Sequence, residues 1–160
     1  MLLPALIRRP TAFESLVTDP IRRETMIAAC HAGCIACRSR ETGGLGLRFA
    51  PGPDGSVEAV FTCDAHYQGY PDRLHGGVIA MLLDAAMTHW LFMHGVRGVT
   101  AKLNVRYHQP VRIETPAWVR ARLVGERPPL HILQAEIVQA DDVRASAEGT
   151  FSSDAGACTV

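Results

Sequence analysis

A single carboxylate lies in the middle of a long apolar segment of the sequence. Asp84 is the only acidic or basic residue between Arg73 and Arg97, histidines aside, and leucine and alanine residues surround it. A carboxylate is costly to desolvate unless it is paired, hydrogen-bonded or placed at an interface or cleft. Two hypotheses stay open. Asp84 is a functional carboxylate, which we favour, or it is a buried structural residue that caps a backbone group or pairs with an arginine.

The tripeptide His75-Gly76-Gly77 stands where this apolar segment begins. Glycines leave backbone N–H groups unobstructed, and the N-terminus of a helix carries a partial positive charge. Such a site suits an oxyanion or an acyl carbonyl, and His75 could act as a base. The alternative is a tight turn into a helix, in which His75 only bonds to the preceding loop.

Gly76 and Asp84 are too far apart to serve one reaction within one chain. Eight positions on a helix correspond to about 12 Å along its axis. No single ester or thioester carbonyl can touch both groups. An enzymatic role therefore requires two antiparallel helices from two subunits, and an isologous two-fold dimer would have two equivalent sites.

Polar and apolar residues alternate along residues 99–109. The odd positions from Val99 to Tyr107 carry residues that we count as apolar, and polar residues occupy the even positions from Thr100 to His108. Strict period two predicts a strand with one covered face and one polar face. Thr100 is expected on the polar face, where its hydroxyl either orients a water beside the carboxylate or simply faces solvent.

Cysteines gather with a histidine in the segment CHAGCIAC. Cys30, His31, Cys34 and Cys37 could in principle hold zinc, but no second CxxC or HxxxH pair follows. Packing or incidental cysteines are the favoured interpretation, so we expect no metal. The sequence has no P-loop, dinucleotide-binding glycine motif, GxSxG elbow or HExxH motif, so we expect no cofactor and disfavour a serine-triad hydrolase.

The elements that must position these residues indicate a domain of the α+β class. A proline-free apolar segment at residues 78–95, which Gly95 can terminate, predicts one long helix that is buried on most of its faces. About six antiparallel strands are expected to curl as a sheet around this helix. They are predicted at Leu45–Ala50, Ser56–Cys63, Val99–Gln109, Ala117–Val124, Leu130–Gln139 and Val143–Phe151.

We divide the chain into an N-terminal helical arm (residues 1–33), a single domain (34–153) and a short C-terminal tail (154–160). Within the arm, residues 11–29 suggest a broken helix that restarts at Pro20. Residues 64–74, which precede the long helix, are expected to form a polar loop.

The overall charge of the chain disfavours some classes of partner. Its 160 residues include 16 basic and 16 acidic side chains, so the formal net charge is zero. This balance gives no support for binding nucleic acid or an anionic membrane. The apolar run before Arg8 and Arg9 is too short for a signal peptide, and Asp84 makes residues 78–93 a poor membrane span. We expect a soluble, cytoplasmic protein.

Three segments together resemble the hotdog-fold acyl-CoA thioesterases, in the branch of the 4-hydroxybenzoyl-CoA thioesterase superfamily that contains PaaI-type and THEM-type enzymes. The segments are HYQGYPDRLHGGVIAMLLDAAMTHW, GVTAKLNVRYHQPV and RASAEGTF, and the resemblance covers about residues 34–152. The combination of HGG, an acid nine residues after its histidine and a TAxLNVxY strand is fairly specific. The resemblance implies the hotdog fold, in which a curled antiparallel sheet wraps one long central helix.

The resemblance also implies a reaction, which is hydrolysis of an acyl- or aryl-CoA to a carboxylic acid and coenzyme A. A homodimer or a dimer of dimers would carry it out without a cofactor or a metal. Gly76 would supply the oxyanion N–H, and Asp84 of the facing subunit would be the base or nucleophile. Thr100 would position the water, and His75 would assist near the carbonyl. We place the substrate-binding positions at Gln68, Gly69, Gly77, Thr88, Asn104 and Arg106.

Two other functions stay open. A non-catalytic acyl-CoA-binding protein of the same fold would bind thioesters without turnover, and Asp84 would then be structural. An enoyl-CoA hydratase or dehydratase of the hotdog type is less favoured, because its histidine and acid belong to a different motif. The chain also departs from some relatives at Gly69, where they carry an Asn, so Gln68 is the candidate for an amide contact.

Overall fold

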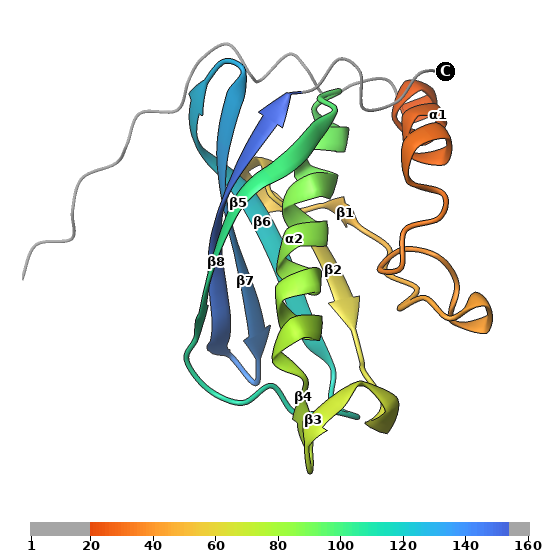
Figure 1. Ribbon diagram of the computed structural model, residues 1–160, viewed down its shortest axis with the longest axis vertical. Helices are drawn as coiled ribbons and strands as arrows, with labels where there is room; N and C mark the ends of the chain where they lie inside the picture. The colour runs from red at the N-terminus through yellow and green to blue at the C-terminus, as the bar shows by residue number, and fades with distance from the viewer. Residues whose placement is uncertain (1–19, 154–160) are drawn as a thin grey trace, which may run out of the picture.

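A six-stranded antiparallel sheet and one long helix form most of the computed structural model, which describes residues 20–153 (Figure 1). The strand order in the sheet is β1-β2-β6-β7-β8-β5, so β5 lies at one edge. The predicted α+β class is confirmed. The strands are β1 (Ala50–Pro51), β2 (Val57–Phe61), β5 (Gly98–Tyr107), β6 (Ala117–Arg127), β7 (Leu130–Gln139) and β8 (Asp142–Ser153).

The long helix α2 (Gly76–Met93) lies across one face of the sheet and supplies much of the core. Leu82, Leu83 and Met87 are fully buried, and they share one cluster with Phe151 of β8. Complete burial of a side chain of this size stabilises the fold by about 1.5–3 kcal/mol relative to leaving it exposed. The prediction of a single long helix over this segment is confirmed.

One stripe of residues along α2 does not pack into the core between the helix and the sheet. Gly77 is exposed, and Ala80, Met81 and Asp84 are half-buried. Their spacings of three and four residues place them on one side of the helix. The sheet therefore covers most of α2, as predicted, and leaves a narrow stripe that includes the carboxylate. By length and composition alone α2 could cross a membrane, but most of its residues are buried inside the fold.

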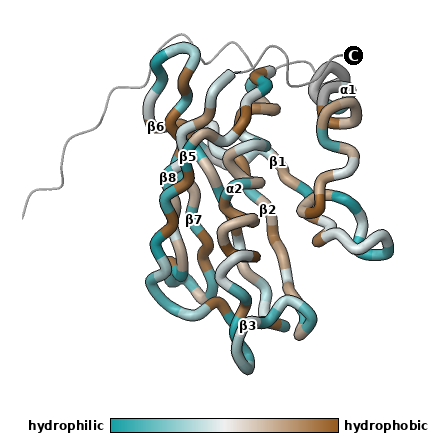
Figure 2. Tube along the Cα trace, in the orientation of Figure 1, coloured by the Kyte–Doolittle hydropathy of each residue, from teal (hydrophilic) through white to brown (hydrophobic). Residues whose placement is uncertain are grey.

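Hydrophobic and hydrophilic residues alternate along the strands (Figure 2). In β6, Ala117, Val119 and Ala121 are buried, whereas Trp118 and Arg120 are exposed. Successive side chains of a strand point to opposite faces of the sheet. One face of the sheet therefore contacts α2, and the other face is directed outward and is more polar.

Residues 32–39, the cysteine-rich loop, connect α1 (Pro20–His31) to the 3-10 helix η1 (Arg40–Thr42). The segment that follows this loop differs from the prediction. We expected a strand at residues 45–50, but only β1 pairs with the sheet. Leu45 donates its backbone N–H to the Ile35 carbonyl at 2.9 Å, and Leu47 donates to the Ala36 carbonyl at 3.0 Å. These bonds tie the segment to the cysteine-rich loop, and the same N–H groups are then not available to a strand ladder.

The predicted polar loop before α2 contains a small second sheet. It is a hairpin of β3 (Gln68–Tyr70) and β4 (Arg73–Leu74). Asp72, between the two strands, has a positive φ of 60°. Asp adopts this left-handed conformation more readily than most residues do, which explains how the chain turns so tightly here. The hairpin leads directly into the N-terminus of α2.

The helix α1 (Pro20–His31) precedes the sheet and contacts α2. It begins at the proline where the helix was predicted to restart, in keeping with the preference of Pro for the first helical turn. The rest of the predicted arm (residues 1–19) and the predicted tail (154–160) lie outside the described residues. Short 3-10 helices lie in the connections: η1 (Arg40–Thr42), η2 (Pro53–Gly55) and η3 (Ala65–Tyr67).

A substitution at Gly149 in β8 tests how closely α2 packs against the sheet. A Cβ atom added there would lie 2.7 Å from Phe151 Cε2 and 2.9 Å from Met87 Sδ. We expect Gly149→Ala to lower the free energy of unfolding by about 1–3 kcal/mol, because an overfilled core displaces side chains and backbone. Urea denaturation measures the change. Gly33→Ala is the control, since nothing lies within 4 Å of its added Cβ; equal stability of the two variants would contradict the prediction.

Candidate active site

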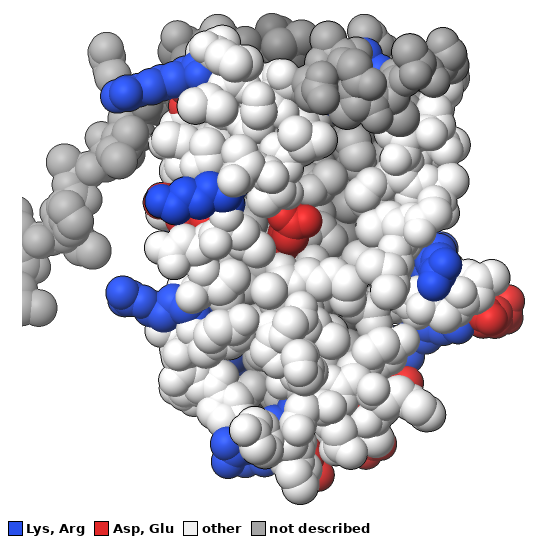
Figure 3. All heavy atoms as spheres, viewed as in Figure 1, with Lys and Arg blue, Asp and Glu red and all other residues white. Residues whose placement is uncertain are grey.

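A hydrogen bond between Asp84 and Thr100 joins α2 to the edge strand β5. Thr100 Oγ1 donates to Asp84 Oδ1 at 2.7 Å. Among the side chains that the structure describes, no Lys or Arg forms an ion pair with Asp84. Figure 3 shows an acidic patch over α2 with mostly uncharged side chains around it. A neutral donor thus holds the carboxylate where a ligand can reach it.

A β-bulge in β5 places Thr100 on the helix side of the sheet. Thr100 is paired with the core residue Phe151, whereas Lys102 is paired with Thr150, so the register shifts at Ala101. Directly opposed residues of an antiparallel pair share a face, so Thr100 points toward α2 and Lys102 points away from it. The predicted strict alternation, which grouped Thr100 with the polar residues that follow, is wrong at this point.

The surroundings of Asp84 raise its pKa above the ordinary value of an aspartate. Burial is the main cause, because desolvation disfavours the charged carboxylate. The hydrogen bond from Thr100 and the electrostatic effect of His31 act in the opposite direction. Burial lowers the pKa of His31, and the charge of Asp84 partly opposes that shift. A carboxylate with a raised pKa accepts a proton more readily, which suits a general base.

A pocket of about 280 Å³ opens beside this pair. Thr100 belongs to its lining, and so does Thr88, which follows Asp84 by one turn of α2. The predicted substrate-binding position Thr88 therefore lies at a cavity next to the carboxylate. The other lining residues are Cys30, His31, Phe92, Arg97, Gly98 and Val99. His31 was not predicted as part of this site, and its only signal in the sequence was its place in the cysteine-rich segment.

The N-terminus of α2 leaves one backbone N–H without an acceptor. His75 caps the helix, because its Nδ1 accepts a hydrogen bond from the Gly77 N–H at 2.9 Å. The N–H groups of Val78 and Ile79 donate to the His75 carbonyl. Within the described residues the Gly76 N–H has no hydrogen-bond partner, and it stands at the positive end of the helix dipole. Gly76 is therefore the available donor, whereas the N–H of Gly77 is occupied by the cap.

Tyr107 is a site residue that the sequence analysis missed. Its hydroxyl donates to the Gly76 carbonyl at 3.0 Å, and its ring is 3.6 Å from where a Cβ of Gly76 would lie. We had counted Tyr107 among the apolar residues of its strand, although a tyrosine carries a polar hydroxyl that seeks a partner. This contact holds the end of β5 against the first turn of α2, next to the unpartnered N–H.

The hairpin before α2 approaches His75 closely. A Cβ atom at Gly69 would lie 3.2 Å from both Cα and Cδ2 of His75, so the glycine permits this approach. Gln68 is exposed and is paired with Leu74, the residue before His75. The predicted substrate-binding positions Gln68 and Gly69 thus lie at the N-terminal end of α2, beside the Gly76 N–H.

Asn104 and Arg106 lie on the other face of the sheet. Beyond the bulge they are paired with Glu148 and Ser146 of β8, and their side chains are directed away from α2. There they line an open groove of about 750 Å³, together with residues of β6, β7 and β8. The predicted grouping of Asn104 and Arg106 with Thr100 is therefore wrong, because the bulge separates them.

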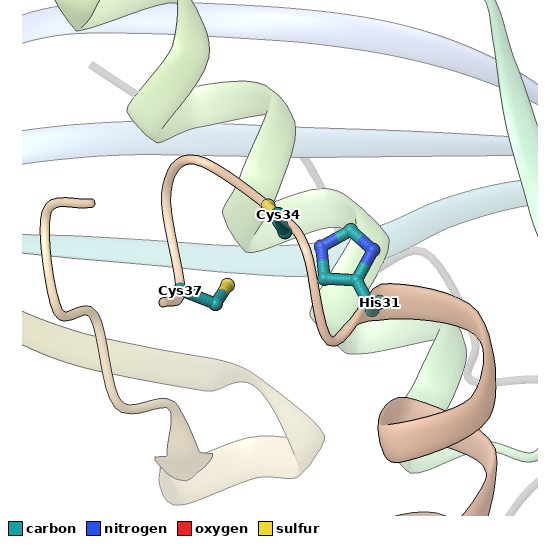
Figure 4. A group of neighbouring side chains, drawn as sticks. All are labelled: His31, Cys34 and Cys37. Carbon is teal, nitrogen blue, oxygen red and sulfur yellow. The ribbon is translucent and has the colours of Figure 1, made fainter. Parts of the chain in front are cut away.

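His31, Cys34 and Cys37 converge at the end of α1 and in the loop that follows (Figure 4). Their ligand atoms lie within 4.8 Å of one another. In the described part of the chain this is the only group of three or more His, Cys, Asp or Glu residues that could hold a metal ion. Cys30 is disulfide-bonded, so it does not belong to this thiol group.

The sequence model of the Thioesterase superfamily matches residues 72–146, a range that includes Gly76, Asp84 and Thr100. Acyl-coenzyme A thioesterase THEM4 of Rattus norvegicus is 30% identical to the chain over 83 residues. The aligned part is 50% of this chain and 36% of THEM4, so the chain spans little more than a third of that relative's length.

Solved structures show the same fold. A crystal structure of a thioesterase superfamily protein has a TM-score of 0.71 at 30% identity, covering 75% of this chain and 63% of that one. The E. coli PaaI protein from the phenylacetic acid degradation operon has a TM-score of 0.66 at 16% identity, covering 82% of this chain and 93% of that one, which is evidence of fold alone. With the antiparallel sheet on one long helix, these structures confirm the hotdog fold, and the match over residues 72–146 supports the resemblance to the thioesterase superfamily.

Proposed function

We propose that the chain is an acyl-CoA thioesterase, which hydrolyses an acyl- or aryl-CoA to a carboxylic acid and coenzyme A. The observation that carries the proposal is the place of Asp84. It is a half-buried carboxylate on the uncovered stripe of α2, held by Thr100 at 2.7 Å beside a pocket. The relative THEM4, which is named an acyl-coenzyme A thioesterase, supports the class of substrate.

In the proposed reaction the Gly76 N–H polarises the thioester carbonyl and stabilises the oxyanion. Asp84 takes a proton from a water held by Thr100, the water oxygen attacks the carbonyl carbon, and the C–S bond breaks to release the coenzyme A thiolate, which is then protonated. In the alternative route Asp84 attacks the carbonyl carbon directly, the C–S bond breaks to release the coenzyme A thiolate, and water then hydrolyses the mixed anhydride that has formed. Single turnover in oxygen-18 water separates the two, because label found in Asp84 afterwards excludes a base-only role.

The two halves of this proposed site come from two subunits. Gly76 and Asp84 are eight positions apart on α2, which corresponds to about 12 Å along the helix axis. In an isologous homodimer, the N-terminus of α2 in one subunit approaches Asp84 of the other. Two features support this arrangement: α2 has an uncovered stripe, and no described strand pairs with the outer edge of the adjacent β5. The same proposal includes the association of two such dimers into a tetramer as an alternative to the dimer.

The pocket beside Asp84 is the proposed site of the acyl group. Its volume of about 280 Å³ is slightly below the range of roughly 300–1,000 Å³ for sites that hold drug-sized ligands. This favours a small acyl or aryl group within the space that one subunit provides. We also propose a cytoplasmic location without a nucleic-acid or membrane partner, in keeping with the zero net charge.

Replacement of the carboxylate tests the proposal directly. We expect Asp84→Asn to lower kcat by at least about 100-fold, because an amide can neither accept the proton nor attack the carbonyl. Release of free thiol from a panel of short-chain, long-chain and aryl acyl-CoA thioesters measures the loss. Asp141→Asn is the matched control, since this exposed residue has a φ of 63° that Asn also accepts. Tight thioester binding without turnover by the wild type across the panel would favour a binding protein instead.

A proline at position 76 removes the proposed oxyanion donor while it preserves the helix. Proline is favoured at the first helical position, and His75 already has the extended conformation (φ −62°, ψ 135°) that a residue before proline adopts. We expect Gly76→Pro to lower kcat by about 100- to 1,000-fold, the usual effect of losing one oxyanion donor. Gly76→Ala keeps the N–H, so it is the control and should retain most of the activity.

The Gly76→Pro variant also tests whether each active site combines residues from two subunits. A mixed dimer of Gly76→Pro and Asp84→Asn subunits would keep one site with both groups intact, so random exchange should restore about a quarter of the wild-type activity. Mass spectrometry of the intact complexes verifies the exchange. If mixed dimers form and no activity returns, the two groups do not act together across the interface.

The hydrogen bond from Thr100 predicts a change in pH dependence. This bond favours the charged carboxylate, so it lowers the pKa of Asp84 against the effect of burial. In Thr100→Val we expect the pKa of Asp84 to rise and the acid limb of the kcat/KM profile to move to higher pH. Thr150→Val, in the neighbouring strand and on the outer face, is the control. An acid limb that stays in place in Thr100→Val would show that this bond does not tune the titrating group.

A further inference from the structure

We propose that His31, Cys34 and Cys37 bind a zinc ion that fastens the end of α1 and the cysteine-rich loop to α2. The three residues follow the spacing His-x2-Cys-x2-Cys. Their ligand atoms lie within 4.8 Å of one another, and each side chain is half-buried. A cluster of one imidazole and two thiols is a donor set that zinc prefers. This site is separate from the proposed chemistry at Asp84.

The distances fit a tetrahedral ion after a small contraction. Zinc binds sulfur at about 2.3 Å and nitrogen at about 2.0–2.1 Å, which puts neighbouring ligand atoms roughly 3.5–3.8 Å apart. The three ligand atoms lie within 4.8 Å of one another, so a bound ion would draw them together by no more than roughly 1 Å. Figure 4 shows His31 at the end of α1, with Cys34 and Cys37 on the loop that follows it.

A second observation concerns the imidazole itself. His31 Nε2 is a buried nitrogen atom with no hydrogen-bond partner among the described residues. A buried polar atom without a partner is costly, and native structures usually satisfy it. We assign Nε2 as the ligand atom, since a bound cation would satisfy this nitrogen and fix the orientation of the ring.

The fourth position of a tetrahedral site has a donor nearby. His89 of α2 places its Nε2 at 3.0 Å from Cys37 Sγ. Its ring also stacks on Phe49 at a centroid distance of 4.4 Å, which holds it beside the cluster. We take His89 as the fourth ligand, so that the ion connects the loop to the C-terminal half of the core helix.

The place of the cluster explains what the ion would do. His31 lines the pocket next to Thr100, and its electrostatic effect reaches Asp84. A zinc ion on His31 therefore fixes one wall of the pocket without contact with the reacting atoms. We regard the site as structural, because His89 stands beside the cluster to fill the fourth position and neither Asp84 nor Thr100 belongs to the ligand group.

The test measures metal in the full-length chain without an affinity tag, purified under argon without chelator. After dialysis against a small excess of Zn²⁺, we expect about one equivalent of zinc per chain by mass spectrometry of the digested protein. The double variant Cys34→Ser/Cys37→Ser should lose at least about 100-fold in zinc affinity. Cys63→Ser is the control, because Cys63 is another free cysteine but lies outside the cluster, and this variant should bind zinc like the wild type.

Cobalt binding is measured in the wild-type protein, so its result does not depend on whether a variant folds. Co²⁺ added to the wild-type protein should produce the thiolate-to-metal charge-transfer absorption that only sulfur ligands give, and Zn²⁺ should displace it. Absence of bound zinc in the wild type, absence of that absorption, or equal zinc binding by the double variant and the wild type would each overturn the proposal.

Discussion

The position of the Asp84 side chain and the packing of α2 on the sheet constrain each other. A charged carboxylate in the middle of a core helix cannot be turned toward the sheet without a desolvation cost of several kcal/mol. The helix therefore has one acceptable rotation about its axis, in which Leu82, Leu83 and Met87 fill the core. In that rotation the carboxylate stays on the uncovered stripe, where Thr100 can donate to it. The packing of the core therefore explains why this stripe is uncovered as much as the proposed active site does.

The bulge in β5 resolves a conflict between pairing and function. An unbroken strand would direct Thr100 to the same face as Asn104, away from the helix. One extra residue at Ala101 reverses the direction of the side chain at position 100, while the rest of the strand keeps its pairing with β8. The edge of the sheet tolerates such an irregularity because only one neighbouring strand has to adjust to it.

The two ends of the uncovered stripe have different electrostatic character. At the first turn of α2, His75 caps the Gly77 N–H and Tyr107 binds the Gly76 carbonyl, while the Gly76 N–H has no partner among the described residues and lies at the positive end of the helix dipole. Eight positions later, burial opposes the negative charge of Asp84. Hydrolysis of a thioester needs a hydrogen-bond donor at the carbonyl oxygen while a nucleophile, either an activated water or the carboxylate itself, attacks the carbonyl carbon. One chain offers both groups but keeps them apart, which is why a second copy enters the proposed mechanism.

The sequence by itself determined the class of the fold and the neighbourhood of the site. A long apolar helix without proline and the alternation along β6, β7 and β8 are local patterns, and an isolated acid such as Asp84 is conspicuous in a core helix because burial of charge is costly. Only the tertiary structure decided the direction of Thr100, the approach of His31 to Asp84, and the bonds that tie Leu45 to the cysteine-rich loop instead of a strand. Each of these depends on a register or a contact between segments far apart in the chain. Such contacts leave no mark in the local pattern, because they are set by what the partner segment presents and not by the residue alone.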